Sequence, residues 1–503
     1  MINKILLIDI ENIIRDDKNV FSWNMSHYPI GLMYLASSVN SLYPNIEIKI
    51  FHTFTSENPI RDLIDLLHSF QPDLIGLRAL SVYKKDFYML AEILRKEVPQ
   101  KYLIAGGPYP SISYKEILLD RLVDIVVIGE GEITFRELVE ELQTCDSLPN
   151  NIPGTAIISH GRVMKNKSRP LISDVDSIPF PDYALIDIKK YSNAINQTFI
   201  GKNSANIFSS RGCPFQCFYC HKLFGKTMRR RSPDNIVAEM KEHYDKRNIR
   251  NFIFLDDVFN VPLDAAKQVL KLICQTFSDI NINFPNGLRA DHIDDEFINL
   301  LEACGTMQIV LAIESATHRL QKYMGKNLNI ELSQINIEKL SRKFIVTVMY
   351  IIGFPTETLS EAEETIAFAQ LLEYVTQPVL NILRVYEDSP IIKILNPSSK
   401  QMKLISSQSQ TSHSERIFYN GEFSKPTFYG DYFSRELVPL KSEDIFRLNI
   451  KWIHSVLNNS RRITNSYKVM KKFINDNEII SFYKHFLNNE EFELSDLMRM
   501  MKL

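Results

Sequence analysis

Long hydrophobic runs are missing from this sequence of 503 residues. A helix that crosses a bilayer needs about 20 consecutive apolar residues. The longest candidate, Ile345 to Phe354, contains Thr347 and suits a buried parallel strand. An excess of one charge is missing too, because the formal net charge is −2. The composition therefore gives no argument for a membrane span or for nucleic acid as a partner.

Cysteine and glycine are both scarce. Three of the six cysteines, Cys145, Cys274 and Cys304, are scattered. Isolated cysteines are usually buried as small hydrophobic side chains, so we expect no disulfide framework and a reducing, cytoplasmic location. The chain has 17 glycines, about half the ~7% of usual proteins. The few that cluster, at 106–107 and 129–131, therefore indicate tight turns where a ligand approaches the backbone.

The other three cysteines, Cys213, Cys217 and Cys220, fall within eight residues, just after an apolar segment. Three close thiolates suit zinc or an iron–sulfur cluster, and the fourth ligand decides between them. No fourth cysteine lies nearby, and His221 directly follows Cys220, where its side chain is poorly placed to reach the same ion. We expect a [4Fe–4S] cluster with one iron open to a small molecule. A structural zinc site is the alternative.

This spacing resembles the CxxxCxxC signature of the radical SAM superfamily. In that family the open iron binds S-adenosylmethionine (SAM), and one electron from the cluster cleaves SAM to give a 5′-deoxyadenosyl radical. The resemblance implies that the three cysteines hold this cluster and that Tyr219 contacts adenine. It also implies an external one-electron donor of the flavodoxin or ferredoxin type.

Residues 1–145 alternate short apolar runs with segments of helical spacing. The expected strands are Ile5–Ile10, Ile46–Ile50, Leu74–Leu77, Tyr102–Ile104 and Ile125–Ile128. The expected helices are Ile60–Phe70, Tyr83–Glu97 and Thr134–Leu142. Such alternation predicts an α/β fold, a Rossmann-like domain with a parallel sheet that binds ligands beyond the carboxyl ends of its strands.

Segments 28–36, 105–110 and 128–134 resemble, in order and spacing, the cobalamin-binding domain of B12-dependent radical SAM enzymes. The resemblance implies cobalamin contacts at Arg78, Gly106, Gly107, Pro108, Tyr109, Gly129, Glu130 and Gly131. The Asp-x-His-x-x-Gly loop of many corrinoid proteins is absent, and Tyr109 stands where the family usually has histidine. Arg78 would place a cation beneath the corrin and resist coordination of cobalt. The alternative is a surface arginine paired with Asp73 or Asp86.

Residues 146–202 read as a proline-rich linker with an extended path. The strand–helix alternation then resumes six times within residues 203–390. The expected strands are Ala205–Phe208, Phe252–Leu255, Ile282–Leu288, Gln308–Ile313, Ile345–Ile352 and Val379–Leu383. The expected helices are Ser232–Tyr244, Leu263–Phe277, Glu296–Ala303, Ile330–Arg342 and Ser360–Tyr374. Six units resemble the partial (βα)6 barrel of radical SAM enzymes, with chemistry at the carboxyl ends of the strands.

Polar residues follow successive strands of this barrel, and the resemblance implies a role for each. Asp256 would contact the amino group of the methionine portion of SAM, and Arg289 its carboxylate. Glu314 would accept hydrogen bonds from ribose hydroxyls or the amino group. Gly353 and Pro355 belong to a turn that would lie beside adenine. Any one of these residues alone suits a salt bridge or a loop, and their order along the chain supports a SAM site.

Residues 391–503 are expected to form a mostly helical region that shapes the substrate pocket or a lid, with helices at Ser442–Leu457 and Asn465–Asn475. Tyr386 and Glu387, just after the sixth strand, are the residues expected to meet the substrate, and Tyr386 is the catalytic candidate. Aromatic clusters beyond them are more often core than ligand cage.

Together the resemblances imply a cobalamin-dependent radical SAM methyltransferase. It would move a methyl group from SAM through methylcobalamin to an unactivated carbon of a small molecule or peptide. One alternative is a radical SAM enzyme that catalyses cyclisation or rearrangement, with or without cobalamin. Another is a corrinoid or redox sensor without catalysis, which would not need a complete series of SAM contacts.

Overall fold

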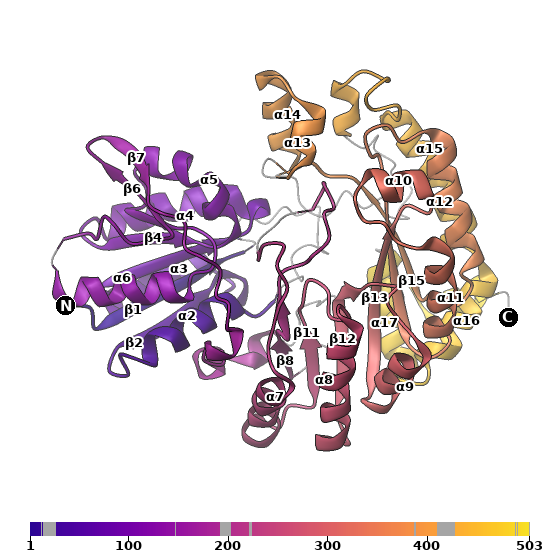
Figure 1. Ribbon diagram of the computed structural model, residues 1–503, viewed down its shortest axis with the longest axis horizontal. Helices are drawn as coiled ribbons and strands as arrows, with labels where there is room; N and C mark the ends of the chain where they lie inside the picture. Colours follow the sequence, from indigo (N-terminus) through magenta and orange to yellow (C-terminus); the bar gives the residue numbers. More distant parts are fainter. Residues whose placement is uncertain are drawn as a thin grey trace. The chain divides into compact units, whose positions relative to one another are not determined.

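A computed structural model describes residues 1–11, 13, 27–145, 147–191, 203–220, 224–386, 389–409, 428–487, 489 and 491–501. The chain divides into two compact units, residues 1–196 with 223–225, and residues 197–222 with 226–503 (Figure 1). None of the helices described is long and apolar enough to cross a membrane. The four segments expected from the sequence, with boundaries after residues 145, 202 and 390, stay predictions.

The first unit contains a seven-stranded sheet in the order β2-β1-β3-β4-β5-β6-β7. Its strands are β1 (Lys4–Ile10), β2 (Glu47–His52), β3 (Leu74–Ala79), β4 (Tyr102–Gly106), β5 (Ile125–Val127), β6 (Thr155–Ser159) and β7 (Arg162–Lys165). The first five are parallel, which confirms the predicted strands. β6 and β7 form an antiparallel hairpin at the edge. They lie in the proline-rich segment and were not predicted.

Helices cover both faces of this sheet. They are α2 (Ile30–Asn40), α3 (Pro59–Phe70), α4 (Lys84–Glu97), α5 (Pro108–Leu119) and α6 (Glu132–Thr144). Apolar residues of α2 and α6 share one buried cluster with the sheet, and those of α3, α4 and α5 share the other. Strand β1 is almost wholly buried, as expected for a strand covered on both faces.

Helix α5 was not predicted from the sequence, where Gly106-Gly107-Pro108 was interpreted only as a turn. Gly107 has a φ of +85° and precedes the helix, and Pro108 is its first residue. Proline suits the first position of a helix because its fixed φ is already helical. An N–H group at that position has no partner within the helix, so its absence from proline costs no hydrogen bond. The same three residues therefore end β4 and begin α5.

The second unit contains a six-stranded parallel sheet in the order β15-β14-β13-β12-β11-β8. Its strands are β8 (Ser204–Ile207), β11 (Asn251–Phe254), β12 (Asn281–Leu288), β13 (Thr306–Glu314), β14 (Ile345–Ile352) and β15 (Gln377–Ile382). All six predicted strands are confirmed. Because the strands lie in chain order, each connecting helix returns the chain beside its predecessor, which gives the partial barrel.

The helices of this unit include the five that were predicted. They are α7 (Pro233–Arg247), α8 (Leu263–Thr276), α9 (Asp295–Ala303), α10 (His318–Tyr323), α11 (Ile330–Ser341), α12 (Leu359–Leu371), α13 (Ile391–Leu395), α14 (Ser399–Ser409), α15 (Ser442–Trp452), α16 (Ser460–Met470), α17 (Asp476–Leu487) and α18 (Leu494–Met501). Side chains of Ser232, Asp294, Asn329 and Thr358 cap four of them by accepting backbone N–H bonds.

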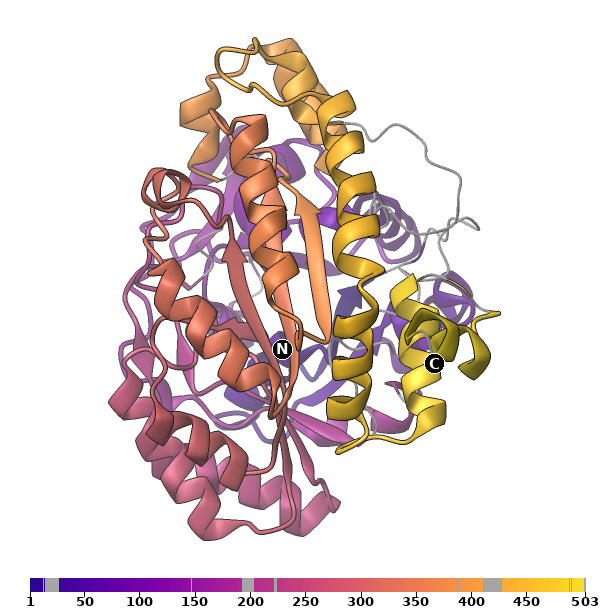
Figure 2. The same cartoon turned by 90° about the vertical axis from the view of Figure 1, so that its right-hand side faces the viewer.

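The C-terminal region reaches both ends of the barrel strands. Helices α16 to α18 share a hydrophobic cluster with Met307 and Ile345, at the amino ends of β13 and β14. Helix α15 lies beside α12 on the outside of the barrel (Figure 2). Residues 428–437 contact the turn after β14 at its other end, where Thr356 N donates to Leu437 O over 2.8 Å. A substrate-pocket or lid role stays a prediction.

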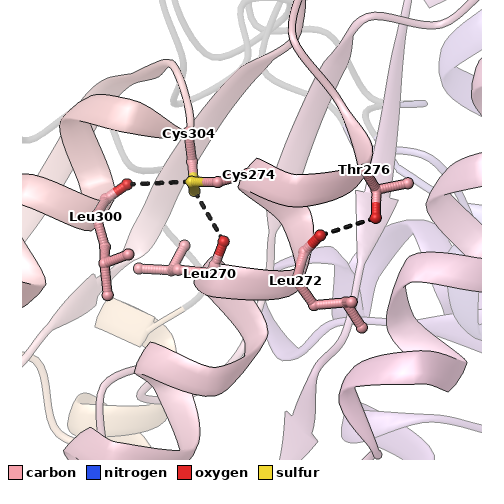
Figure 3. Close-up of a disulfide and its surroundings, with 6 residues drawn as sticks. All are labelled: Leu270, Leu272, Cys274, Thr276, Leu300 and Cys304. Atoms are coloured by element: carbon pink, nitrogen blue, oxygen red, sulfur yellow. Dashed lines mark hydrogen bonds between the residues drawn. A yellow bond between two sulfur atoms is a disulfide. The ribbon is translucent and has the colours of Figure 1, made fainter.

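Cys274 and Cys304 form a disulfide between α8 and the end of α9 (Figure 3). The expectation that both are isolated hydrophobic side chains is wrong. The two helices pack side by side, so the Cα atoms lie 4.9 Å apart although 30 residues separate them in sequence. Cys145 forms no disulfide, but it is exposed, so the expectation that it is buried as a small hydrophobic side chain is wrong as well.

We predict four reactive thiols, not six, in the apo chain unfolded in denaturant without a reductant. Reduction should raise the number to six and lower the free energy of unfolding by roughly 3 to 4 kcal/mol, the chain-entropy estimate for a loop of this length. Thiol titration and urea unfolding measure both quantities. A Cys145→Ser control should lose one thiol and keep its stability. Six thiols before reduction would contradict the disulfide.

Candidate functional site

The three clustered cysteines lie on a loop whose base is a two-stranded ladder. β9 (Ser210–Arg211) and β10 (Arg229–Arg230) pair antiparallel, so both ends of the loop are held together. Gly212 has a φ of +93°, which glycine adopts at little cost, and it turns the chain just before Cys213. Cys213, Cys217 and Cys220 are free and half-buried. The structure thus gathers three thiols on one braced loop.

Segments far along the chain hold this loop in shape. Phe218 N donates to Met324 O over 3.1 Å, and Phe218 O accepts from Ile391 N over 2.9 Å. Gly325 has a φ of +74°, and a Cβ there would lie 2.8 Å from Gln216 O. The loop and the segment around residue 325 are therefore in backbone contact, which only glycine permits at that position.

The loop chemistry fits a cluster bound by three thiolates. Burial raises the pKa of the Cys220 thiol to about 12, Cys217 adds to the rise, and the ammonium of Lys226 opposes it. Lys226 Nζ also donates to Phe215 O. Thiolates suit iron–sulfur clusters, and the raised pKa means that assembly must release protons.

Asp256, which was predicted to contact SAM, is buried directly after β11 and is occupied by protein donors. Its Oδ1 accepts from the hydroxyls of Ser209 and Ser210, and its Oδ2 accepts from Ser209 N. Burial raises the pKa of this carboxyl, and the serine donors oppose the rise. The carboxylate therefore ties the residues before the cysteine loop to β11. Its predicted SAM contact stays a prediction.

Asp257 is the neighbour that lies close to the cysteines. Its negative charge contributes to the raised pKa values of Cys213 and Cys220, after the larger effect of burial. Asp257 is half-buried. The predicted contact was Asp256 and not the adjacent Asp257, because nothing in the sequence shows which of the two carboxylates the serines occupy.

Two predicted SAM contacts, Tyr219 and Glu314, lie together. Tyr219 OH donates to Glu314 Oε1 over 3.1 Å, and Lys326 Nζ donates to the same oxygen over 2.8 Å. Glu314 ends β13 with a φ of +66°, a left-handed conformation that is costly for glutamate and is often kept at functional sites. Lys326 was missed because it lies twelve residues beyond Glu314.

Arg289 is held by several partners at once. Its guanidinium donates to Asp291 and to the carbonyl oxygens of Lys326 and Asn327, and it lies 3.8 Å from the centre of the Phe215 ring. Phe215 belongs to the cysteine loop. The Phe215 ring therefore links Arg289 to the cysteine loop. The predicted contact with the carboxylate of SAM stays a prediction.

The turn after β14, which contains Gly353 and Pro355, is clamped from two sides. Glu357 Oε2 accepts from the backbone N–H groups of Gly353 and Phe354. Tyr429 OH donates to Gly353 O over 2.7 Å. Gly353 has a φ of +95°, and a Cβ there would lie 2.6 Å from the Phe428 ring. Phe428 and Tyr429 were missed as site residues because they come from a distant aromatic segment.

Tyr386, the catalytic candidate, is half-buried after β15. Its carbonyl oxygen accepts from Ser389 Oγ over 2.6 Å, which shapes the following turn. Glu387 and the alternative ligand His221 lie outside the described residues. The catalytic role of Tyr386 stays a prediction.

The residues predicted to bind cobalamin lie at the carboxyl ends of three neighbouring strands. Arg78 lies near the end of β3, Gly106 ends β4, and Gly129 follows β5. A Cβ at Gly107 would lie 2.8 Å from Arg78 Cγ, so these two predicted contacts are adjacent. A Cβ at Gly129 would meet no atom of the described residues within 4 Å. Bare backbone beside open space fits a bulky planar cofactor.

Arg78 pairs with Asp9 at the end of β1, not with the predicted alternatives Asp73 or Asp86. Its Nη1 donates to Asp9 Oδ1 over 2.6 Å. Burial lowers the pKa of Arg78, but the carboxylates of Asp9 and Glu11 outweigh burial and raise it overall. The guanidinium is therefore charged and anchored between the neighbouring strands β1 and β3.

The other predicted cobalamin residues have local roles. The Tyr109 ring is buried 5.5 Å from the Phe87 ring, so it belongs to the core. Glu130 Oε2 accepts from Ile172 N over 2.8 Å. Pro108 begins α5, and Gly131 packs its backbone against Leu35. Their cobalamin contacts stay predictions.

Two family models match the chain in the expected order. The model of the B12 binding domain matches residues 19–139, and the model of the radical SAM superfamily matches residues 207–369. The chain is 31% identical over 353 residues to a protein of Pyrococcus horikoshii described as the uncharacterized methyltransferase PH0819. That match covers 69% of this chain and 73% of the relative.

A second relative and a solved structure also match most of this chain. Cytidylyl-2-hydroxyethylphosphonate methyltransferase of Streptomyces wedmorensis is 25% identical over 413 residues, which cover 73% of this chain and 76% of that protein. The structure of the cobalamin-dependent S-adenosylmethionine radical enzyme OxsB, with aqua-cobalamin and S-adenosylmethionine bound, matches with a TM-score of 0.68 and 16% identity. It covers 100% of this chain and 76% of that one, and it shows the same fold.

We predict that Glu357 makes the stability of the second unit depend on pH. Burial raises its pKa from the ordinary 4.5 to about 8, against the opposing N–H bonds of Phe354 and Gly353. The stability that the protonated side chain contributes is complete below about pH 4.5 and is lost as the pH rises through 8.

Relative to Glu357→Gln, which stays neutral, the wild-type chain should lose roughly 2 to 3 kcal/mol of unfolding free energy between pH 5.5 and 7.5. Urea unfolding of both apo chains at the two pH values measures this loss. A difference between the chains that does not change with pH would show that Glu357 is ionised in the fold.

Proposed function

Since the chain belongs to the cobalamin-dependent radical SAM methyltransferases, we propose that it transfers a methyl group from SAM to an unactivated carbon of a small molecule or peptide. Its cofactors are a [4Fe–4S] cluster, SAM and cobalamin. The single observation that supports the radical step is the loop of three free cysteines with the Tyr219–Glu314 contact beside it.

When bound, the cofactors supply the radical and carry the methyl group, and the protein supplies binding and orientation. Cys213, Cys217 and Cys220 would hold the cluster. Lys326 holds the Glu314 carboxylate, which leaves Glu314 Oε1 fixed beside Tyr219. The clamped turn at Gly353 and Pro355 would bind adenine along its backbone.

We assign the contact with the amino group of SAM to Asp257 in preference to Asp256. The Asp256 carboxylate already accepts three hydrogen bonds from Ser209 and Ser210. Asp257 lies close enough to Cys213 and Cys220 to affect both thiols. A cationic amino group bound to the cluster would therefore find its negative partner in Asp257.

For cobalamin, Gly107 and Gly129 would leave room for the corrin, and Arg78 would face it from below. A guanidinium held by Asp9 cannot coordinate a metal, because it has no free lone pair at any accessible pH. This supports a cobalamin without a protein ligand to cobalt.

Radical SAM enzymes need an electron donor, and we propose a flavodoxin or ferredoxin type. The net charge of −2 gives no reason to include nucleic acid. A cytoplasmic location stays part of the proposal. The Cys274–Cys304 disulfide does not support it, since disulfides are rare in a reducing compartment.

We predict about four irons and about one cobalamin per chain after anaerobic reconstitution with iron, sulfide and hydroxocobalamin. Cys217→Ala should lose the cluster, and its rate of 5′-deoxyadenosine formation should fall at least 100-fold, but it should keep cobalamin. The control Cys145→Ala should keep the cluster, the rate and cobalamin. Metal analysis, absorbance and chromatography of products measure these quantities. Iron without cobalamin would overturn the cobalamin part.

The products separate the proposal from its alternatives. S-adenosylhomocysteine formed together with 5′-deoxyadenosine would support methyl transfer. 5′-Deoxyadenosine without S-adenosylhomocysteine, in the presence of cobalamin and a converted substrate, would indicate cyclisation or rearrangement. A cluster that never cleaves SAM would indicate a sensor.

We predict that Tyr429→Phe weakens SAM binding about five-fold, the effect of one hydrogen bond. The variant removes only the hydroxyl that holds Gly353 O. Equilibrium dialysis of SAM against the reconstituted chain measures the affinity. Tyr467→Phe, which removes a hydroxyl bonded to Asp476, is the matched control. Equal affinities in both variants would exclude a role of this clamp in SAM binding.

A further inference from the structure

A second group of potential metal ligands lies in the first unit. Asp9, Glu11 and His52 are all buried, and the ligand atoms they offer lie within 4.8 Å of one another. Asp9 and Glu11 lie at and just beyond the end of β1, and His52 ends the neighbouring strand β2. Parallel pairing places Asp9 directly opposite His52. None of the three residues was predicted from the sequence to have a role.

The orientation of His52 suits a metal ligand. Its Nδ1 lies 2.8 Å from Tyr191 OH, and its Nε2 lies 3.2 Å from Glu11 Oε2. Histidines that bind metals use one ring nitrogen for the ion and the other for a hydrogen bond that fixes the ring. Tyr191 supplies that bond, which leaves Nε2 directed toward the carboxylates.

One buried carboxylate oxygen of this group has no hydrogen bond. Asp9 Oδ1 accepts from Arg78 Nη1 over 2.6 Å, and Glu11 Oε2 lies 3.2 Å from His52 Nε2. Asp9 Oδ2 has no hydrogen-bond partner in the described part of the chain, and a buried polar atom without such a partner is costly. A divalent ion would serve both carboxylates and Nε2.

We propose that Asp9, Glu11 and His52 form a second metal site, for a divalent ion of the Mn²⁺, Fe²⁺ or Zn²⁺ type, with water completing the coordination. Two carboxylates and one imidazole are ligands that such ions accept. The site is separate from the cysteine loop, which belongs to the other unit. It does not depend on methyl transfer or on the identity of the substrate.

Manganese is the probe of choice, because carboxylate ligands suit it while thiolates select softer metals. The full chain, with its cluster reconstituted and oxidised, is titrated with Mn²⁺, and free Mn²⁺ is measured by its EPR signal. We expect one tight site per chain. Asp9→Asn and His52→Gln should each lower the affinity for Mn²⁺ at least 100-fold.

Tyr191→Phe should weaken binding by about 10- to 100-fold, because it removes only the partner of His52 Nδ1. Asp65→Asn, an exposed carboxylate of the same unit, is the matched control and should bind as the wild-type chain does. Circular dichroism checks the fold. If Asp9→Asn does not fold, His52→Gln and Tyr191→Phe decide. No bound Mn²⁺ in the wild-type chain, or equal affinity in His52→Gln and Asp65→Asn, would overturn the proposal.

Discussion

The parallel direction of the strands is the constraint on which both candidate sites depend. Parallel strands end at the same edge of a sheet, so residues that are far apart in sequence meet there. Asp9, Arg78 and Gly107 meet at such an edge in the first unit. The cysteine loop, Glu314 and Gly353 follow strand ends in the second. The order and direction of the strands therefore determine where each site lies in its unit.

The parallel strands of both sheets, most helices and the family were predictable, because apolar spacing and motif order are local properties of the sequence. Partners were not. Nothing near Asp256 shows that Ser209 and Ser210 occupy it, and nothing near Cys274 indicates Cys304. Helix α5 was hidden because its first residues also read as a turn. These features arise from packing between elements, which a single sequence does not record.

The loops at the barrel edge are held by buried carboxylates and close backbone contacts. Asp256 fixes the residues before the cysteine loop, Glu357 fixes the turn after β14, and Gly325 lies against Gln216. A loop fixed in this way presents its ligand groups without reorganisation when a cofactor arrives, which lowers the entropic cost of binding. Residues that are distant in sequence also hold these loops. Tyr429 donates to Gly353 O in the turn after β14, and Ile391 N donates to Phe218 O in the cysteine loop.

The packing of α16 to α18 on Met307 and Ile345 has a consequence for synthesis. A chain folds from its N-terminus as it leaves the ribosome. The first unit is nearly continuous in sequence and has all the strands of its sheet by residue 165. The barrel strands β13 and β14 are complete by residue 352, yet the helices that cover their amino ends follow only after residue 460. During that interval the apolar side chains of Met307 and Ile345 have not yet met the helices that cover them.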